Sequence, residues 1–117
     1  MARDILIQIQ DALIKIEWRF APVKSPDDFT TTPQGMEKLD SICMLLIAIG
    51  ESCKKIDRIT EGKLFELYPE IDWKGVKGLR DIISHHYFDV DAEEIFLICL
   101  EHIPPLRKTI DIMLKKH

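Results

Sequence analysis

Residues 33–58 read PQGMEKLDSICMLLIAIGESCKKIDR, and their apolar positions decide the fold class that the sequence predicts. One stripe recurs at intervals of three and four, the spacing of a helix seam: Met36, Leu39, Cys43, Leu46, Gly50 and Cys53. A second stripe, Ile42, Ile49 and Ile56, widens the apolar surface. Thr32 followed by Pro33 provides a capping hydroxyl and a first-turn proline. The segment therefore predicts a helix from about Pro33 to about Arg58 with two buried faces, at the centre of a bundle or at a subunit interface.

Gly50 lies in the middle of this predicted helix, where glycine costs about 1 kcal/mol relative to alanine. A close approach of another helix would explain its use. A glycine that is simply tolerated fits the sequence equally well.

The rest of the chain also has helical periodicity. A first helix, with Ile5, Ile9 and Leu13 on one face, ends before Pro22, and APVKSPDDFTTTP at 21–33 has the composition of a loop. A short helix over 63–68 precedes Pro69. Asp72 can cap the next helix, from Trp73 to about His86, whose inward-facing residues are predicted to be Val76, Leu79, Ile82, Ile83 and His86.

Asp91 and Glu94 have the spacing of a capping box for a helix that begins at about Ala92. Pro104 and Pro105 must break or kink that helix, and a last helical stretch covers 106–115. No segment alternates convincingly as a strand. The predicted fold is all-α, an up-and-down bundle of about five helices in a single domain over 1–117, with a C-terminal helix kinked at Pro104–Pro105.

Composition and charge limit the function classes. The N-terminal apolar pattern is interrupted by acidic residues, so neither a signal peptide nor a membrane span is predicted, and three cysteines without paired spacing fit reduced thiols in the cytoplasm. The net charge of −4 argues against general attraction to nucleic acid. Residues 54–80 nevertheless carry seven basic and five acidic side chains, a local excess of +2, against nine and fifteen elsewhere.

This basic segment leads into LRDIISHHYF at 79–88, where polar groups gather in an apolar stretch. Asp81 and His85 are four residues apart, so on a helix the carboxylate can orient the imidazole. Arg80, Ser84 and Tyr87 form a neighbouring stripe. Arg80 and His85 are separated by about 140° around an ideal helix. They can converge if the arginine reaches across, if the helix loosens, or if a second subunit completes the site.

An imidazole that exchanges protons and a guanidinium that binds phosphate suit metal-independent cleavage of an RNA phosphodiester. Taken alone, however, an Asp–His pair near a helix end is more often a structural hydrogen bond. His86 is expected to line the core or an interface. Cys99 and His102 have helical ligand spacing but no partners, and the sequence offers no phosphate-binding glycine loop or serine triad. We therefore expect no metal and no cofactor.

The segment YPEIDWKGVKGLRDIISHHYFDVD, residues 68–91, resembles the signature of HepT-like toxins of the HEPN superfamily. There an R-x4-H-x-Y motif follows a P-E-I-x-W stretch and a Gly-Leu pair. In this sequence the motif is Arg80, His85 and Tyr87, with Asp81 after the arginine. The IGES sequence that ends at Ser52 and HIPPLRKTI at 102–110 resemble other parts of the family pattern.

The resemblance implies a HEPN-like bundle that forms a homodimer around a shared cleft and cleaves RNA without a metal. His85 would act as general acid–base, Arg80 would bind the phosphate and Asp81 would position His85. Lys77 and Ser84 are further candidates for substrate binding. The resemblance also implies a nucleotidyltransferase-fold (MNT) antitoxin that can transfer AMP to Tyr87.

Two features depart from this picture. Asp89 stands where many relatives have glycine, and the total charge is acidic for an RNA-binding protein. A non-catalytic module that binds a nucleotide or regulates a nucleotidyltransferase is therefore an alternative function. A helical dimerisation module without nucleotide chemistry is a third.

Overall fold

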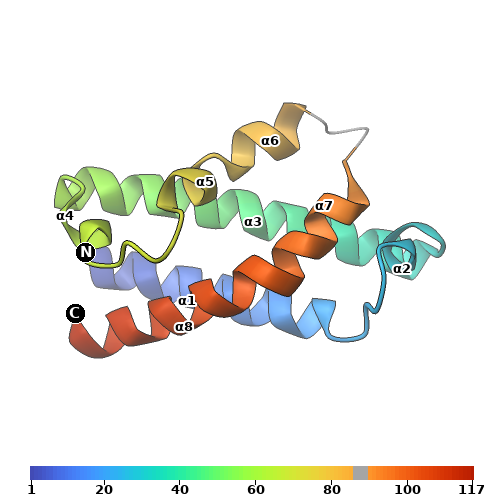
Figure 1. The fold of residues 1–117 in the computed structure, drawn as a ribbon, viewed down its shortest axis with the longest axis horizontal. Helices are drawn as coiled ribbons and strands as arrows, with labels where there is room; N and C mark the ends of the chain where they lie inside the picture. The colour runs from blue at the N-terminus through green and yellow to red at the C-terminus, as the bar shows by residue number, and fades with distance from the viewer. Residues whose placement is uncertain (86–89) are drawn as a thin grey trace.

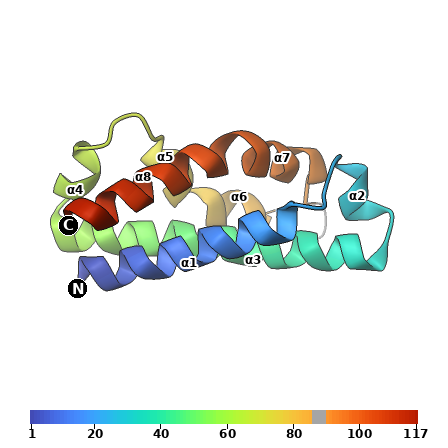
Figure 2. The same cartoon turned by 90° about the horizontal axis from the view of Figure 1, so that it is seen from below.

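The computed structural model describes residues 1–85 and 90–117, which form an up-and-down helical bundle (Figure 1). Its elements are α1 (Ala2–Phe20), α2 (Asp27–Thr30), α3 (Pro33–Thr60), α4 (Lys63–Glu66), α5 (Trp73–Lys77), α6 (Leu79–His85), α7 (Ala92–Leu97), the π-helix η1 (Ile98–His102) and α8 (Ile103–Lys116). α1 and α3 run antiparallel, α5 and α6 return along α3, and α7–η1–α8 runs back so that both termini lie at one end (Figures 1 and 2). The all-α, up-and-down prediction is confirmed.

The long helix α3 is the centre of the bundle, as its two apolar stripes predict. It packs against α1, α2, α4, α5, α6 and α7. Apart from Gly35, its buried residues come from both stripes: Leu39, Ile42, Cys43, Leu46, Ile49, Gly50, Cys53 and Ile56. Met36 is half exposed, so its assignment to the buried seam is wrong. In this first turn of α3 the buried residue is Gly35, which lies against the backbone of Asp28, so the stripe pattern does not predict which residue is buried there.

Local capping explains where several helices begin. Thr32 accepts a hydrogen bond from the backbone N–H of Gly35, and Asp72 accepts one from Gly75. Asp91 accepts hydrogen bonds from Glu93 and Glu94 at the start of α7. All three predicted starts are confirmed.

The structure corrects two predicted segments. The stretch 21–33 is not only loop, because Asp27–Thr30 forms α2 with Phe29 fully buried. The single helix predicted from Trp73 to about His86 is two helices, because the chain leaves the helical path at Gly78 (φ −86°, ψ −2°). Trp73 anchors the start of α5, where its ring stacks on Phe65 at 3.9 Å between centroids.

The two prolines of the C-terminal rod lie in the first turn of α8, and the chain continues through them without a break. The backbone passes through η1 immediately before them, and the N–H of Ile103 donates to the carbonyl of Ile98 five residues earlier. Proline lacks an N–H and crowds the preceding turn, which favours a wider turn at this point. The buried apolar positions along the rod are Ile95, Cys99, Ile103, Leu106, Ile110 and Met113, and Thr109 is buried with them.

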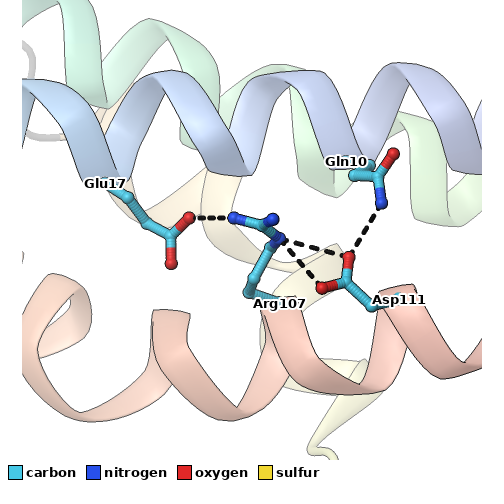
Figure 3. A network of polar contacts seen from close by, with 4 residues as sticks. All are labelled: Gln10, Glu17, Arg107 and Asp111. Atoms are coloured by element: carbon cyan, nitrogen blue, oxygen red, sulfur yellow. Dashed lines mark hydrogen bonds and ion pairs between the residues drawn. The ribbon is translucent and has the colours of Figure 1, made fainter.

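A polar network joins α1 to α8 (Figure 3). Arg107 donates from Nη1 to Glu17 and from Nε to both carboxylate oxygens of Asp111, at 3.1 and 3.2 Å. Gln10 donates to Asp111 at 2.8 Å. The hydrogen bond from Gln10, together with Arg107, lowers the pKa of the Asp111 carboxyl. This network is one polar attachment of the C-terminal helix to the bundle.

Candidate active site

The helix α6 carries most of the predicted site residues. Its buried residues show which side of the helix faces the bundle and which side faces solvent. Leu79 and Ile83, four residues apart, are buried between α6 and its neighbours. Arg80, Asp81 and Ser84 lie on exposed positions of the same helix. The structure therefore places these three predicted site residues on the outer surface of α6, as a site for a large substrate requires.

The approach of α5 and α6 to α3 is close at Gly50. A Cβ added there would lie 2.8 Å from the backbone oxygen of Val76 and 3.7 Å from the Cβ of Leu79. A backbone oxygen cannot move aside as a flexible side chain can. Of the two interpretations of Gly50, close helix approach is therefore the correct one.

Arg80 reaches back from α6 to α3. Its Nη1 lies 3.7 Å from Oε1 of Glu51, which also accepts a hydrogen bond from Lys54 at 3.4 Å. The Arg80 side chain is 57% exposed. An exposed ion pair at this distance is weak and lies beyond ordinary hydrogen-bond range. Glu51 is thus a weak partner, and the exposed guanidinium is accessible to a phosphate.

Sequence reasoning did not identify Glu51 as a neighbour of Arg80. The two residues are far apart along the chain and meet only because α6 folds onto α3. The available signal was the position of Glu51, directly after the glycine at which the helices approach.

Lys77, predicted to bind substrate, forms an ion pair with Asp57 of α3, and both side chains are 28% exposed. Its positive charge is therefore already compensated within the protein. RNA binding by Lys77 stays a prediction, and it would require a phosphate to compete with the Asp57 carboxylate.

The remaining motif residues lie at the limit of the described chain. The backbone is α-helical through position 85, so positions 80 and 85 keep the separation of about 140°. Loosening of the helix before position 85 therefore does not bring them together. The His85 side chain and residues 86–89, with the predictions for His86, Tyr87 and Asp89, lie outside the described residues.

The cysteine thiols are unsuited to nucleophilic chemistry. Burial raises the pKa of Cys43 to about 11, and burial raises the pKa of both Cys53 and Cys99 to about 12. At neutral pH these thiols are protonated, and only a thiolate is an effective nucleophile. Among the described side chains, those of 1–84 and 90–117, no three His, Cys, Asp or Glu residues are grouped so that they could hold a metal ion. Within the same ranges, no helix is both long and apolar enough to cross a membrane.

Comparison with known proteins assigns the chain to a family. The profile of the family described as "Ribonuclease HepT-like" matches residues 9–113, which include α3, α6 and the whole R-x4-H-x-Y motif. The chain belongs to the HepT-like ribonuclease family. The resemblance of the 68–91 segment to HepT-like proteins is thereby confirmed.

HepT-like relatives are found in archaea and bacteria. A protein of Methanocaldococcus jannaschii named as a putative RNase is 36% identical over 70 residues, which cover 60% of this chain and 54% of the relative. A protein of Caldanaerobacter subterraneus with the same kind of name is 32% identical over 68 residues, 58% of this chain and 57% of the relative.

A protein of Thermococcus cleftensis named as a probable ribonuclease HepT is 33% identical over 67 residues, 57% of each chain. The matches thus span little more than half the length of these HepT-like relatives. No solved structure matches the chain.

Proposed function

We propose that this chain is a ribonuclease toxin that cleaves RNA without a metal ion. The observation that carries the proposal is the family match over residues 9–113, with Arg80 of the R-x4-H-x-Y motif exposed on α6. The names of the HepT-like relatives as RNases support the same substrate class.

In the proposed reaction, His85 removes the proton from a ribose 2′-hydroxyl, and the 2′-oxygen attacks the adjacent phosphorus. The bond from phosphorus to the 5′-oxygen breaks, an imidazolium returns a proton to that oxygen, and a 2′,3′-cyclic phosphate remains. Arg80 stabilises the negative charge that develops on the phosphoryl oxygens. Asp81 positions His85, and Ser84 and Lys77 contribute to substrate binding.

A homodimer completes the proposed site. Because positions 80 and 85 point about 140° apart on one regular helix, two copies of α6 facing a shared cleft can present Arg80 from one and His85 from the other. The dimer also doubles the basic surface of residues 54–80, which offsets the net charge of −4 at the site.

Control of the toxin is assigned to a nucleotidyltransferase-fold antitoxin that transfers AMP to Tyr87. The support is the position of this tyrosine two residues after His85, so that an added phosphate would place negative charge beside the substrate phosphate. Mass spectrometry of the chain after coexpression with such an antitoxin tests this step. AMP on Tyr87 is the expected result, and an unmodified Tyr87 in a stable complex would contradict it.

Cleavage of RNA by the purified chain in the presence of EDTA tests the enzymatic proposal. Activity should be lost in His85→Ala and retained in His117→Ala, a matched histidine whose ring contacts Tyr68 far from the motif. Undiminished cleavage by His85→Ala would exclude the assigned mechanism.

The acidic total charge favours the alternative, a non-catalytic regulatory partner of a nucleotidyltransferase. Expression of the chain alone distinguishes the two. A ribonuclease toxin should slow growth, and Arg80→Ala should relieve the effect. A folded wild-type protein that leaves growth and RNA unchanged would support the regulatory function.

A further inference from the structure

A groove runs along the side of the bundle between α5–α6 and α7–η1–α8. Two hollows of about 270 and 520 Å³ lie between these elements. A third of about 430 Å³ adjoins them on α7 and η1 and is lined only by residues from 91–102, and Glu94 and Ile98 line all three. We call the three together the α6–α7 groove. Leu79 and Ile82 form its α6 side, and Ile103 and Leu106 continue it along α8.

The floor of the α6–α7 groove is apolar and open to solvent. Ile82, predicted to face inward, is 43% exposed, because the C-terminal rod does not close over this side of α6. Leu97, beside the third hollow, is 48% exposed. Such large aliphatic side chains gathered along a groove mark a surface that gains free energy when another apolar surface covers it.

The sides of the groove are acidic. Among the described residues that line it, six are carboxylates and none is lysine or arginine; the six are Glu70, Asp72, Asp91, Glu93, Glu94 and Glu101. Asp72 and Asp91 are already used as helix caps, whereas the glutamates are free of that role. This concentration of negative charge repels nucleic acid and attracts a cationic partner.

The groove and the exposed arginine lie on opposite sides of α6. With about 100° per residue, position 82 is about 160° to 200° away from positions 80 and 84, and the buried stripe of Leu79 and Ile83 lies between them. A molecule bound in the groove would therefore contact the helix that carries Arg80 without covering Arg80 itself.

We propose that the α6–α7 groove is a docking site for a basic amphipathic helix of another protein. Apolar side chains at three- and four-residue spacing would contact Ile82 and Ile98. Lysine or arginine residues on the flanks of that helix would pair with the carboxylates. The apolar floor distinguishes this partner from a simple polycation, and the acidic sides distinguish it from RNA.

A titration with synthetic peptides tests the proposal. The probe is a labelled 18-residue helix with leucine on one face and lysine on the other. Its controls are a scrambled peptide of the same composition, which has no apolar face, and a peptide with glutamate in place of lysine. We expect the basic amphipathic peptide to bind at least about tenfold more tightly than either control, a difference of about 1.4 kcal/mol.

Substitutions then locate the binding. Ile82→Lys and Glu94→Lys should each weaken the peptide about tenfold or more. Met44→Lys and Glu37→Lys, which likewise replace an apolar and an acidic residue by lysine at exposed positions of α3 outside the groove, should leave binding unchanged. Circular dichroism confirms that each variant is folded, and amide NMR shifts should appear at Ile82 and Ile98 when the peptide is added.

Several outcomes would overturn the proposal: equal affinity for the scrambled peptide, equal loss in the α3 controls, or displacement of the peptide by single-stranded RNA. Conversion of a dimer to monomers by Ile82→Lys would assign the groove to a second copy of this chain instead. The titration measures no RNA cleavage, so its result is independent of the proposed function.

Discussion

Arg107 and Arg80 each connect two helices, but their surroundings differ. Arg107 lies between Glu17 and Asp111, makes hydrogen bonds to both, and is 29% exposed (Figure 3). Arg80 has Glu51 beside it at 3.7 Å and is 57% exposed. A guanidinium whose donors are used within the fold contributes to stability, whereas one with free donors can bind a substrate. This difference supports a structural role for Arg107 and is consistent with the phosphate-binding role proposed for Arg80.

Substitution of Arg80 is the strongest test of this comparison. Arg80→Ala should lower RNA cleavage by about 10²–10³-fold, the effect of removing one charge-stabilising donor from a transition state. Its free energy of unfolding should change by no more than about 0.5 kcal/mol, since the ion pair with Glu51 is exposed and long. Cleavage assays and urea denaturation measure the two effects. Arg19→Ala, at an arginine of α1 outside the basic segment, is the control. A large loss of stability in Arg80→Ala would mean that Arg80, like Arg107, has a structural role.

Gly50→Ala should disturb the packing of α3 against α5 and against α6, the helix that carries Arg80. The added methyl group meets the Val76 oxygen at 2.8 Å, and overpacking of this kind costs about 1–3 kcal/mol. This cost exceeds the gain in helix propensity of up to about 1 kcal/mol. Urea denaturation should show a net loss of stability, with Ser52→Ala on the same helix as the control. A stabilised Gly50→Ala variant would contradict the close approach of α5 and α6.

Arg107→Met keeps the apolar stem of the side chain and removes its charge. We expect a loss of about 1 kcal/mol in the free energy of unfolding, because Glu17 and Asp111 lose a shared donor at a partly exposed site. The control is Lys63→Met, whose pair with Glu61 is 4.0 Å long and highly exposed. Equal effects in the two variants would mean that the α1–α8 network adds nothing beyond an ordinary surface ion pair.

The smallest expected effect is a pH dependence at Asp111. Its pKa is lowered in the folded protein by the hydrogen bond from Gln10 and by Arg107, so the ionised carboxylate favours folding. This contribution is present above the unfolded-state pKa of about 3.9 and is lost as the pH falls through the lower folded-state pKa. The stability difference between wild type and Asp111→Asn should therefore shrink as denaturation is measured from pH 6 down to pH 3. A difference that is constant over this range would exclude the linkage.

The predictions that succeeded from sequence depend on local interactions. The starts of α3, α5 and α7 follow from capping side chains at Thr32, Asp72 and Asp91, which act on the next few residues. The central position of α3 follows from the width of its apolar surface. These features need no knowledge of how distant segments meet.

The predictions that were wrong concern residues whose burial or partners depend on tertiary packing. Phe29 is fully buried in α2, which packs on α3 and α7, although its segment has the composition of a loop. Ile82 is apolar and correctly spaced for burial, yet the C-terminal rod leaves it beside the groove. At the candidate site, the motif predicted Arg80. Its neighbour Glu51 and the Lys77–Asp57 pair could not be predicted, because they form only when α5 and α6 fold onto α3.

The π-helix η1 explains how the C-terminal rod keeps one side toward the core. Ile95, Cys99 and Ile103 follow each other at intervals of four, and on a regular α-helix each such step would rotate the side chain by about 40° away from its predecessor. The wider turn of η1, with its bond from Ile103 to Ile98, absorbs this angular drift. After the prolines, the intervals of three and four in α8 resume the regular phase. In the sequence, two successive four-residue intervals before the Pro-Pro pair therefore indicate a change of helical phase. The C-terminal rod remains continuous through this change.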